Sequence, residues 1–435
     1  MSYTPVSPEC LEPDSRWPVG KSSAFFTLFV TLALGIFDFI DRQVLAALFP
    51  YIKAEYSLSD TQLGMLVSVV NIAIAVLVIP SAYLIDRWSR KKMMALMGIV
   101  WSLATGACAF AGTFSHLLIA RFFIGAGEAG YNPAGQSLLA ASFPRRLRGT
   151  ALSAFQCSMG IGAPLGLILG AYIAETWGWR HAFGIVAIPG LLVSFLAFFI
   201  KDFKNKAPDP CEPDALVTPE PYWKTVSSLL SKPTLFFVFI AQAMLVLEAI
   251  TLMNWLPSYF NREAAMPMTE ASSLSALYLV IYSIAIFAGG PFVDFMRRYG
   301  MKATSYLQGL ACLLAFGMLW VAFALATPGS LVQLLLLFAQ NLFAQTVVTV
   351  GISITADLSQ PQQRGTAVGL LVTFQNIFGM AIGPFITGVL SDHFSLGNAM
   401  IFMSTFYAVS GLLYFIIAQC YNRDMAKMTS VEAIF

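Results

Sequence analysis

Long apolar stretches dominate the chain. Runs of about 20 residues or more, enough for a helix to cross a hydrocarbon layer of about 30 Å, recur along its whole length. Six come before a polar, proline-containing stretch at 201–232 and six come after it. The predicted spans are 24–49, 61–85, 93–112, 115–142, 149–173, 180–200, 233–260, 271–293, 302–325, 329–357, 365–390 and 398–420. The pattern predicts an all-α membrane protein with 12 transmembrane helices.

The grouping of the spans predicts two six-helix bundles. The N-terminal bundle covers 24–200 and the C-terminal bundle 233–420, joined by a cytoplasmic linker at 201–232. Residues 1–23 lack the apolar core and cleavage site of a secretory signal, so we expect a flexible cytosolic tail. Residues 421–435 form a second tail.

The two predicted bundles carry matching sequence segments in the same order. The matches are Leu48-Phe-Pro-Tyr-Ile with Leu256-Pro-Ser-Tyr-Phe, Asp86-Arg-Trp-Ser-Arg with Asp294-Phe-Met-Arg-Arg, and Arg148-Gly-Thr-Ala with Arg364-Gly-Thr-Ala. Two related bundles that face each other enclose a cavity near the membrane midplane, the arrangement expected of a rocking transporter. The halves should therefore be pseudo-symmetric.

Lys and Arg are distributed unevenly between the two sides of the predicted membrane. The loops on the side opposite to the N-terminus carry Lys53, Arg180 and Arg262, and the loops on the N-terminal side carry most of the others. Positive charge is retained in cytoplasmic loops, so both termini should be cytoplasmic. We expect a multi-pass protein of the cell membrane, which is the inner membrane in a Gram-negative bacterium.

Composition narrows the possible functions. The chain is 57% hydrophobic and 11% charged, with 25 Lys+Arg against 23 Asp+Glu, which gives no electrostatic footprint for nucleic acid. Six scattered cysteines show no ligand spacing, so neither a disulfide nor a metal is expected. No nucleophile with a base, cofactor motif or ATP-binding loop lies at membrane depth, so we expect no enzyme and no cofactor.

Two motifs resemble the signatures of the major facilitator superfamily. Ala82-Tyr-Leu-Ile-Asp-Arg-Trp-Ser-Arg-Lys matches its loop between the second and third helices, with two glycines replaced, and Arg121-Phe-Phe-Ile-Gly-Ala-Gly matches its fourth helix. The resemblance covers nearly the whole chain. It implies a secondary transporter that works by alternating access, whereas a channel is the weaker alternative.

Within that superfamily the chain looks most like the bacterial spinster-like branch. The residues that carry this likeness are Asp41-Arg-Gln, Trp88-Ser-Arg-Lys and Gly127-Glu-Ala-Gly-Tyr-Asn-Pro-Ala. The branch implies an anionic amphiphile as cargo, similar to a lysophospholipid or sphingosine-1-phosphate. The anion:cation symporter branch shares the Asp-Arg pair and implies an organic acid carried with protons. For either cargo, the expected partners are the substrate, protons and membrane lipids, and the expected oligomeric state is a monomer.

Ionisable residues are rare inside the predicted spans and cost several kcal/mol at membrane depth, so they usually face a cavity or a partner. Asp38 and Arg42 stand four residues apart and should pair locally. Asp41 and Glu128 are the expected proton-coupling acids, because desolvation favours a neutral carboxyl and a nearby arginine favours a charged one. Arg42 and Arg121 are the expected ligands of an anionic headgroup. The alternative is a static charge network that holds the bundle together.

The C-terminal half contributes a second set of candidates. Glu248 precedes Pro257 by the same spacing as Asp41 precedes Pro50, so the repeat predicts that it faces the cavity. The expected polar wall there consists of Gln340, Asn341 and Gln375, with Gln345 and Asn376. Interhelical hydrogen bonding is an equally good account of each amide taken singly.

Charged loops should form a cytoplasmic gate. Its expected members, ion-paired in one state and parted in the other, are Asp86, Arg90, Arg145, Arg148 and Asp294. A solvated face that only sets the topology is the alternative.

Overall fold

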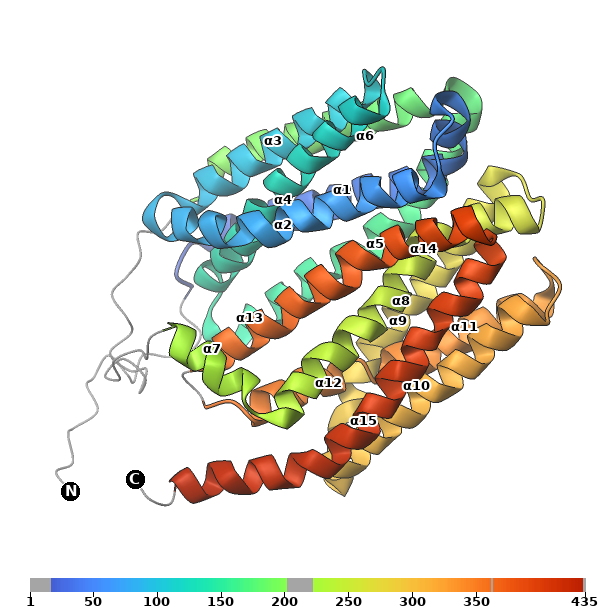
Figure 1. The fold of residues 1–435 in the computed structure, drawn as a ribbon. Helices are drawn as coiled ribbons and strands as arrows, with labels where there is room; N and C mark the ends of the chain where they lie inside the picture. Colours follow the sequence, from blue (N-terminus) through green and yellow to red (C-terminus); the bar gives the residue numbers. More distant parts are fainter. Residues whose placement is uncertain (1–16, 202–221, 361–362, 433–435) are drawn as a thin grey trace.

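The computed structural model describes residues 17–201, 222–360 and 363–432, which fold into two helical bundles (Figure 1). The helices of the N-terminal half are α1 (Lys21–Tyr56), α2 (Asp60–Arg87), α3 (Arg90–Ala109), α4 (Phe114–Ser142), α5 (Arg145–Trp177) and α6 (Trp179–Leu196), the last continued by the 3-10 turn η2 (Ala197–Phe199).

The short helix α7 (Tyr222–Leu230) precedes the C-terminal half. That half consists of α8 (Pro233–Glu263), α9 (Met268–Met296), the 3-10 turn η4 (Arg297–Tyr299), α10 (Met301–Ala324), α11 (Leu331–Thr346), α12 (Thr349–Asp357), α13 (Arg364–Phe374), the π-helical turn η6 (Gln375–Ala381), α14 (Ile382–His393) and α15 (Leu396–Glu432). Three successive elements, α13, η6 and α14, form one span, as do α11 and α12.

The predicted fold class is confirmed. Eleven segments of the described chain are long and apolar enough to cross a membrane. The twelfth span is α4, whose 29 residues include a buried arginine and a buried glutamate.

Side chains cap the backbone N–H groups at the start of α2 and of α4. Thr113 caps α4, and Ser59 with Gln62 forms a capping box on α2.

Two regions differ from the simplest expectation. The helix α15 continues to Glu432 through most of the stretch expected as a tail, and α7 forms inside the expected linker. The expected flexible tail at 1–23 lies outside the described residues up to residue 16, and α1 begins at Lys21.

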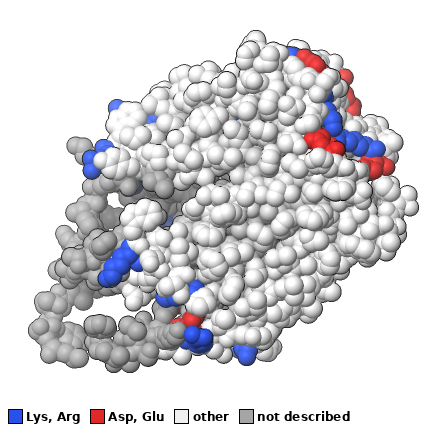
Figure 2. All heavy atoms as spheres, in the orientation of Figure 1, with Lys and Arg blue, Asp and Glu red and all other residues white. Residues whose placement is uncertain are grey.

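The molecule has two distinct ends (Figure 1). We call the end where α1 begins and α15 finishes the terminal end, and the end where α1 meets α2 and α14 meets α15 the distal end. In the view of Figure 2, charged side chains gather at both ends and the surface between them is uncharged. That surface has the character of a belt surrounded by lipid.

The two halves touch along α2 with α14, α5 with α9 and α1 with α8. Glycines allow the backbones of α2 and α14 to approach closely. A Cβ on Gly64 would lie 2.9 Å from the Pro384 carbonyl carbon, and one on Gly388 would lie 2.9 Å from the Thr61 Cα. Any larger side chain at either position would push the halves apart at the distal end.

The π-helical turn η6 receives a hydrogen bond from the other half. The usual donor for the Met380 carbonyl would be the residue four positions later, but Pro384 has no N–H. Asn71 of α2 donates to this carbonyl at 3.3 Å. An amide of the N-terminal half therefore donates to a carbonyl whose α-helical donor is missing in the C-terminal half.

Candidate functional site

Two pairs of oppositely charged residues link α1 to α4 in a crossed arrangement. Arg42 of α1 donates to Glu128 of α4, and Arg121 of α4 donates to Asp41 of α1 at 3.4 Å. Each helix thus gives one acid and one arginine to its neighbour. Both acids are buried: Asp41 is 0% exposed and Glu128 is 3% exposed.

A third acid completes the cluster. Asp38 accepts from Arg42 Nε at 3.2 Å, as its spacing on the helix predicts, and from the Tyr131 hydroxyl at 2.7 Å. One oxygen each of Asp41 and Glu128 has no hydrogen-bond partner among the described residues. The cluster therefore pairs its charges but leaves acceptor capacity free on both candidate coupling acids.

Small residues on α4 bring the cluster together. A Cβ on Gly125 would lie 2.8 Å from the Ala73 side chain of α2, and one on Gly127 would lie 2.6 Å from the Trp101 side chain of α3. Because α4 can sink between α2 and α3, its polar stripe reaches α1. The signature glycines of the fourth helix therefore position the charges.

A cavity of about 400 Å³ lies between the halves beside this cluster. Arg42, 22% exposed at its side chain, and Arg121, 2% exposed, both line it. The remaining lining residues are Phe39, Gln43, Val67, Val70, Asn71, Gln156, Met159, Val246, Ala249, Ile250, Met253, Asn254, Tyr282, Val372, Gln375, Asn376 and Met380. The arginines thus face the cavity and the acids stand behind them, which suits recognition of an anion.

The amides of the C-terminal half divide into two groups. Gln375 and Asn376 line the cavity, whereas Gln340 and Asn341 are 0% exposed inside the bundle. Gln340 donates to the Tyr278 hydroxyl and Asn341 to the Tyr278 carbonyl, each at 3.0 Å. The inner pair therefore makes the interhelical hydrogen bonds that were the alternative account of these amides.

Glu248 occupies the interior of the C-terminal half. It is 0% exposed and is not among the residues that line the cavity. Neither carboxyl oxygen has a hydrogen-bond partner in the described part of the chain. The repeat places Glu248 on the helix that corresponds to α1, but the helix presents it to the bundle core.

The residues expected as a cytoplasmic gate lie around the terminal end. Arg148 donates to the Phe143 carbonyl at 3.3 Å, Arg90 is half-buried, and Asp294 is exposed. The side chains of Asp86 and Arg145 lie outside the described part of the structure. The gate stays a prediction.

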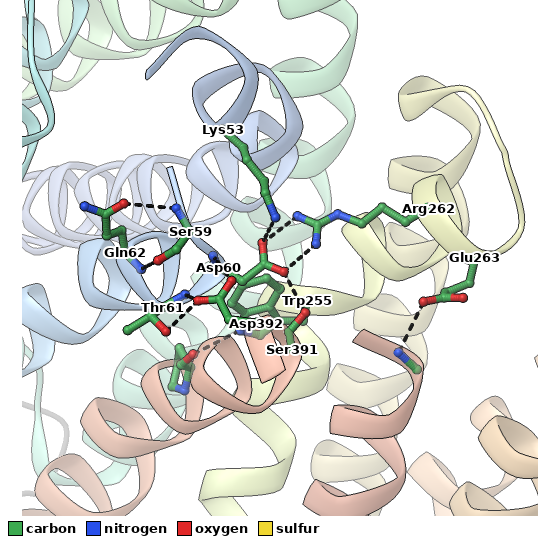
Figure 3. A network of polar contacts seen from close by, with 12 residues as sticks. Lys53, Ser59, Asp60, Thr61, Gln62, Trp255, Arg262, Glu263, Ser391 and Asp392 are labelled. Atoms are coloured by element: carbon green, nitrogen blue, oxygen red, sulfur yellow. Dashed lines mark hydrogen bonds and ion pairs between the residues drawn. The ribbon is translucent and has the colours of Figure 1, made fainter. Parts of the chain in front are cut away.

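The distal end carries a polar network that the sequence reasoning did not anticipate (Figure 3). Asp60 of α2 accepts from Lys53 at 2.6 Å, from Arg262 at 2.7 and 2.9 Å, and from Ser391 at 2.6 Å. Asp392 of α14 accepts from the backbone N–H groups of Asp60 and Thr61, at 2.7 and 2.8 Å. We call these residues the distal network.

The distal network joins one half to the other. Asp60 and Lys53 belong to the N-terminal half, and Arg262, Ser391 and Asp392 to the C-terminal half (Figure 3). Asp392 places a negative charge at the start of α2, where the helix dipole favours it. Lys53 and Arg262 are two of the three cations in the outer loops, and their positions in the sequence indicate the topology but not their shared partner Asp60.

Comparison with known proteins gives the family. A model of the major facilitator superfamily matches residues 31–268 and 238–419. The chain belongs to the major facilitator superfamily. This membership confirms the predicted resemblance, and the superfamily consists of transporters rather than enzymes. No group of three or more His, Cys, Asp or Glu side chains in the described ranges could hold a metal ion.

Two branches of the superfamily are represented among the relatives. The hexuronate transporter of Bacillus subtilis is 26% identical over 384 residues, which cover 84% of this chain and 87% of that protein. Protein spinster of Drosophila melanogaster is 25% identical over 401 residues, which cover 89% of this chain and 65% of that protein. The relatives therefore include spinster proteins and a transporter of a sugar acid, the two kinds of protein that the sequence resembles.

Solved structures share the fold of this superfamily member. A bacterial homologue of the human lysosomal transporter Spinster, in an inward-facing and unoccupied conformation, matches with a TM-score of 0.85 at 20% identity, covering 93% of this chain and 99% of that one. A D-xylose-proton symporter matches with a TM-score of 0.71 at 18% identity, covering 90% and 97%.

Proposed function

We propose that this protein is a proton-coupled transporter that carries an anionic amphiphile by alternating access. The observation that carries the proposal is the crossed pairing beside the cavity, in which two arginines face the cavity and their acids lie behind them. We further propose that the terminal end is cytoplasmic, as the distribution of positive charge indicates. The distal network then closes the outer side, and this conformation is inward-facing.

The pairing supports an exchange of partners. An anionic headgroup on Arg42 competes with Glu128 for the same guanidinium. A buried carboxylate that loses its cation becomes costly as an anion, so it takes up a proton from water in the cavity. Departure of the cargo returns Arg42 to Glu128, and the proton leaves. Arg121 and Asp41 form a second, more deeply buried pair of the same type.

The apolar character of the surroundings supports an amphiphile as cargo. Beyond the arginines, the cavity wall is mostly apolar, with Phe39, Met159 and Met253 among its members. A second cavity of about 560 Å³ lies between α2 and α14 and is lined almost entirely by apolar side chains, including Ile72 and Phe385. An acyl chain fits such surroundings. The resemblance to the spinster-like branch implies the same cargo class.

A second candidate function is symport of an organic acid with protons. The hexuronate transporter and two probable galactarate/D-glucarate transporters of Escherichia coli strains are among the relatives. Amides at the cavity wall favour this candidate because they suit sugar hydroxyls; they are Gln43, Asn71, Gln156, Asn254, Gln375 and Asn376. Either cargo places its carboxylate or phosphate on Arg42.

Transport by purified protein in proteoliposomes tests the coupling. We expect Asp41→Asn and Glu128→Gln to abolish accumulation driven by a pH gradient while cargo counterflow continues, because the neutral side chains occupy the place of the protonated acids. The exposed Glu270→Gln on α9 is the matched control and should behave as wild type. Wild-type gradient dependence in both buried variants would disprove proton coupling, and absence of counterflow in the wild type would point to a channel.

Binding assays test the cargo. Thermal-shift screens should show stabilisation by lysolipids with anionic headgroups, whereas stabilisation by hexuronates alone would favour the second candidate. Arg42→Ala should weaken binding by at least about tenfold, which corresponds to 1.4 kcal/mol. Glu248→Gln should have little effect, because Glu248 does not line the cavity. Equal losses in the two variants would contradict the assigned roles.

We place the protein in the cell membrane as a monomer, since one copy contains the whole cavity.

A further inference from the structure

The buried acid of the C-terminal half has no role in the exchange described above. Glu248 is 0% exposed, and its two carboxyl oxygens accept no hydrogen bond from a described residue. An ionised carboxylate without a partner in an apolar interior carries a desolvation cost far larger than a protein tolerates, so such a group becomes neutral. Burial and geometry together indicate a protonated side chain.

The neighbours of Glu248 are polar but uncharged. Tyr278 of α9 and Tyr407 of α15 lie close enough to interact electrostatically with it, and Tyr282 and Cys312 belong to the same group of side chains. Among the described residues, no lysine, arginine or histidine donates a hydrogen bond to Glu248. No cation is therefore available to hold a carboxylate in this conformation.

The amides bonded to these tyrosines have carbonyl oxygens that lack donors. Gln340 and Gln345 give their amide N–H groups to the hydroxyls of Tyr278 and Tyr407, at 3.0 and 3.2 Å. Their carbonyl oxygens, and that of Asn341, have no donor among the described residues. A proton on Glu248 adds an O–H donor to this region.

Two tyrosines of α9 extend from the region of Glu248 to the cavity. Tyr282 lines the cavity and lies one helical turn from Tyr278 on α9, and the two tyrosines interact electrostatically. The hydroxyls of Tyr278 and Tyr407 already accept from amides, so their own hydrogens remain free to be donated. They can donate hydrogen bonds to the carboxylate that forms when the proton leaves.

We propose that Glu248 is a proton-binding site of the C-terminal half, protonated in the conformation described here, which exchanges its proton with water in the cavity along Tyr278 and Tyr282. Protonation forms one O–H bond on a Glu248 oxygen and breaks one O–H bond of a hydronium ion in the cavity, which becomes water. Release transfers the proton back to a water molecule, re-forms hydronium and leaves a carboxylate that the tyrosine hydroxyls stabilise. This inference does not depend on Asp41, on Glu128 or on the identity of the cargo.

Infrared difference spectroscopy on the full-length protein in lipid nanodiscs tests the proposal without any transport assay. Near neutral pH, the wild type minus Glu248→Gln spectrum should contain the C=O stretch of one neutral carboxyl, and this band should shift on deuteration. The spectrum of Glu270→Gln should show no such loss, because Glu270 is exposed at the start of α9. Absence of the band from the Glu248 difference spectrum would mean an ionised side chain and would overturn the proposal.

The rate of deuterium exchange tests the path. Tyr282→Phe removes the hydroxyl at the cavity wall and should slow exchange of the Glu248 band by about tenfold, the factor for 1.36 kcal/mol on a barrier. A band that never exchanges in the wild type, or an unchanged rate in the variant, would overturn the proposal. If Glu248→Gln does not fold, Glu248→Asp replaces it, because the band then changes frequency. Loss of pH-driven transport in proteoliposomes bears only on Asp41 and Glu128, so the two proposals fail separately.

Discussion

The two halves of the protein bury acids in opposite ways. In the N-terminal half, Asp38, Asp41 and Glu128 each contact an arginine, and the charges alternate between α1 and α4. In the C-terminal half Glu248 has the corresponding place in the sequence repeat, but its electrostatic neighbours are tyrosines and its carboxyl oxygens have no hydrogen-bond partner among the described residues. The same fold therefore accommodates either paired charges or a neutral acid. The outcome depends on whether the neighbouring helix supplies an arginine, as α4 does, or tyrosines, as α9 does.

The largest test of this comparison substitutes one buried ionisable side chain in each half. Arg121→Ala leaves Asp41 buried without its cation, and loss of one partner from a buried pair costs about 3–5 kcal/mol. Glu248→Gln should cost below about 1 kcal/mol, because it replaces a neutral acid by a neutral amide of similar shape. Thermal or denaturant unfolding in lipid nanodiscs measures both.

Equal destabilisation by the two variants would contradict the contrast between the halves. The double variant Arg121→Ala with Asp41→Asn provides the control. It removes both charges of the pair, so it should recover a large part of the stability lost in the single variant.

An intermediate effect is expected at the distal network, where each half supplies one partner of an ion pair. Arg262→Ala removes two hydrogen bonds between the halves, while Asp60 keeps Lys53 and Ser391. Hydrogen bonds to charged groups contribute about 1.5–3 kcal/mol, so the distal-open population should rise by tenfold or more.

Distances between spin labels measure this shift. Labels at the exposed positions Ser115 and Thr327 lie at the distal ends of different halves and should separate in Arg262→Ala. Lys53→Ala is the matched control, because its bond to Asp60 stays within one half. An equal separation in Lys53→Ala would mean that the network does not act across the halves.

The smallest effect compares two buried tyrosines. Tyr131 donates to the Asp38 carboxylate at 2.7 Å, whereas Tyr407 accepts from the neutral amide of Gln345 at 3.2 Å. Bonds to charged groups are roughly twice as strong, so Tyr131→Phe should destabilise the protein by about 1 kcal/mol more than Tyr407→Phe. Unfolding in nanodiscs gives the difference. A larger loss in Tyr407→Phe would mean that the C-terminal half contains charge as well.

The sequence predicted the parts of the fold that depend on hydrophobic length. Twelve spans follow from the 30 Å thickness of the hydrocarbon layer, and the match of Arg121-Phe-Phe-Ile-Gly to a known signature indicated the superfamily. Helical spacing also predicted the contact between Asp38 and Arg42, because residues four apart share a face.

Contacts between helices were harder to predict. Spacing along one helix cannot show that Arg42 pairs with Glu128 and Arg121 with Asp41, since that choice depends on how deeply α4 packs between α2 and α3. It also cannot show that α8 rotates Glu248 away from the cavity. The distal network joins residues about 200 and 330 positions apart in the chain, and local sequence patterns carry no information about such pairs.

The bond from Asn71 to the Met380 carbonyl has a thermodynamic consequence for the transport cycle. Separation of α2 from η6 removes the donor, and Pro384 cannot replace it. A carbonyl left without a donor in a dry environment costs about 1–3 kcal/mol, whereas water relieves that cost. Opening of the distal side is therefore easier when water enters the gap at Met380 and replaces the lost donor. A route that stays dry meets an additional barrier.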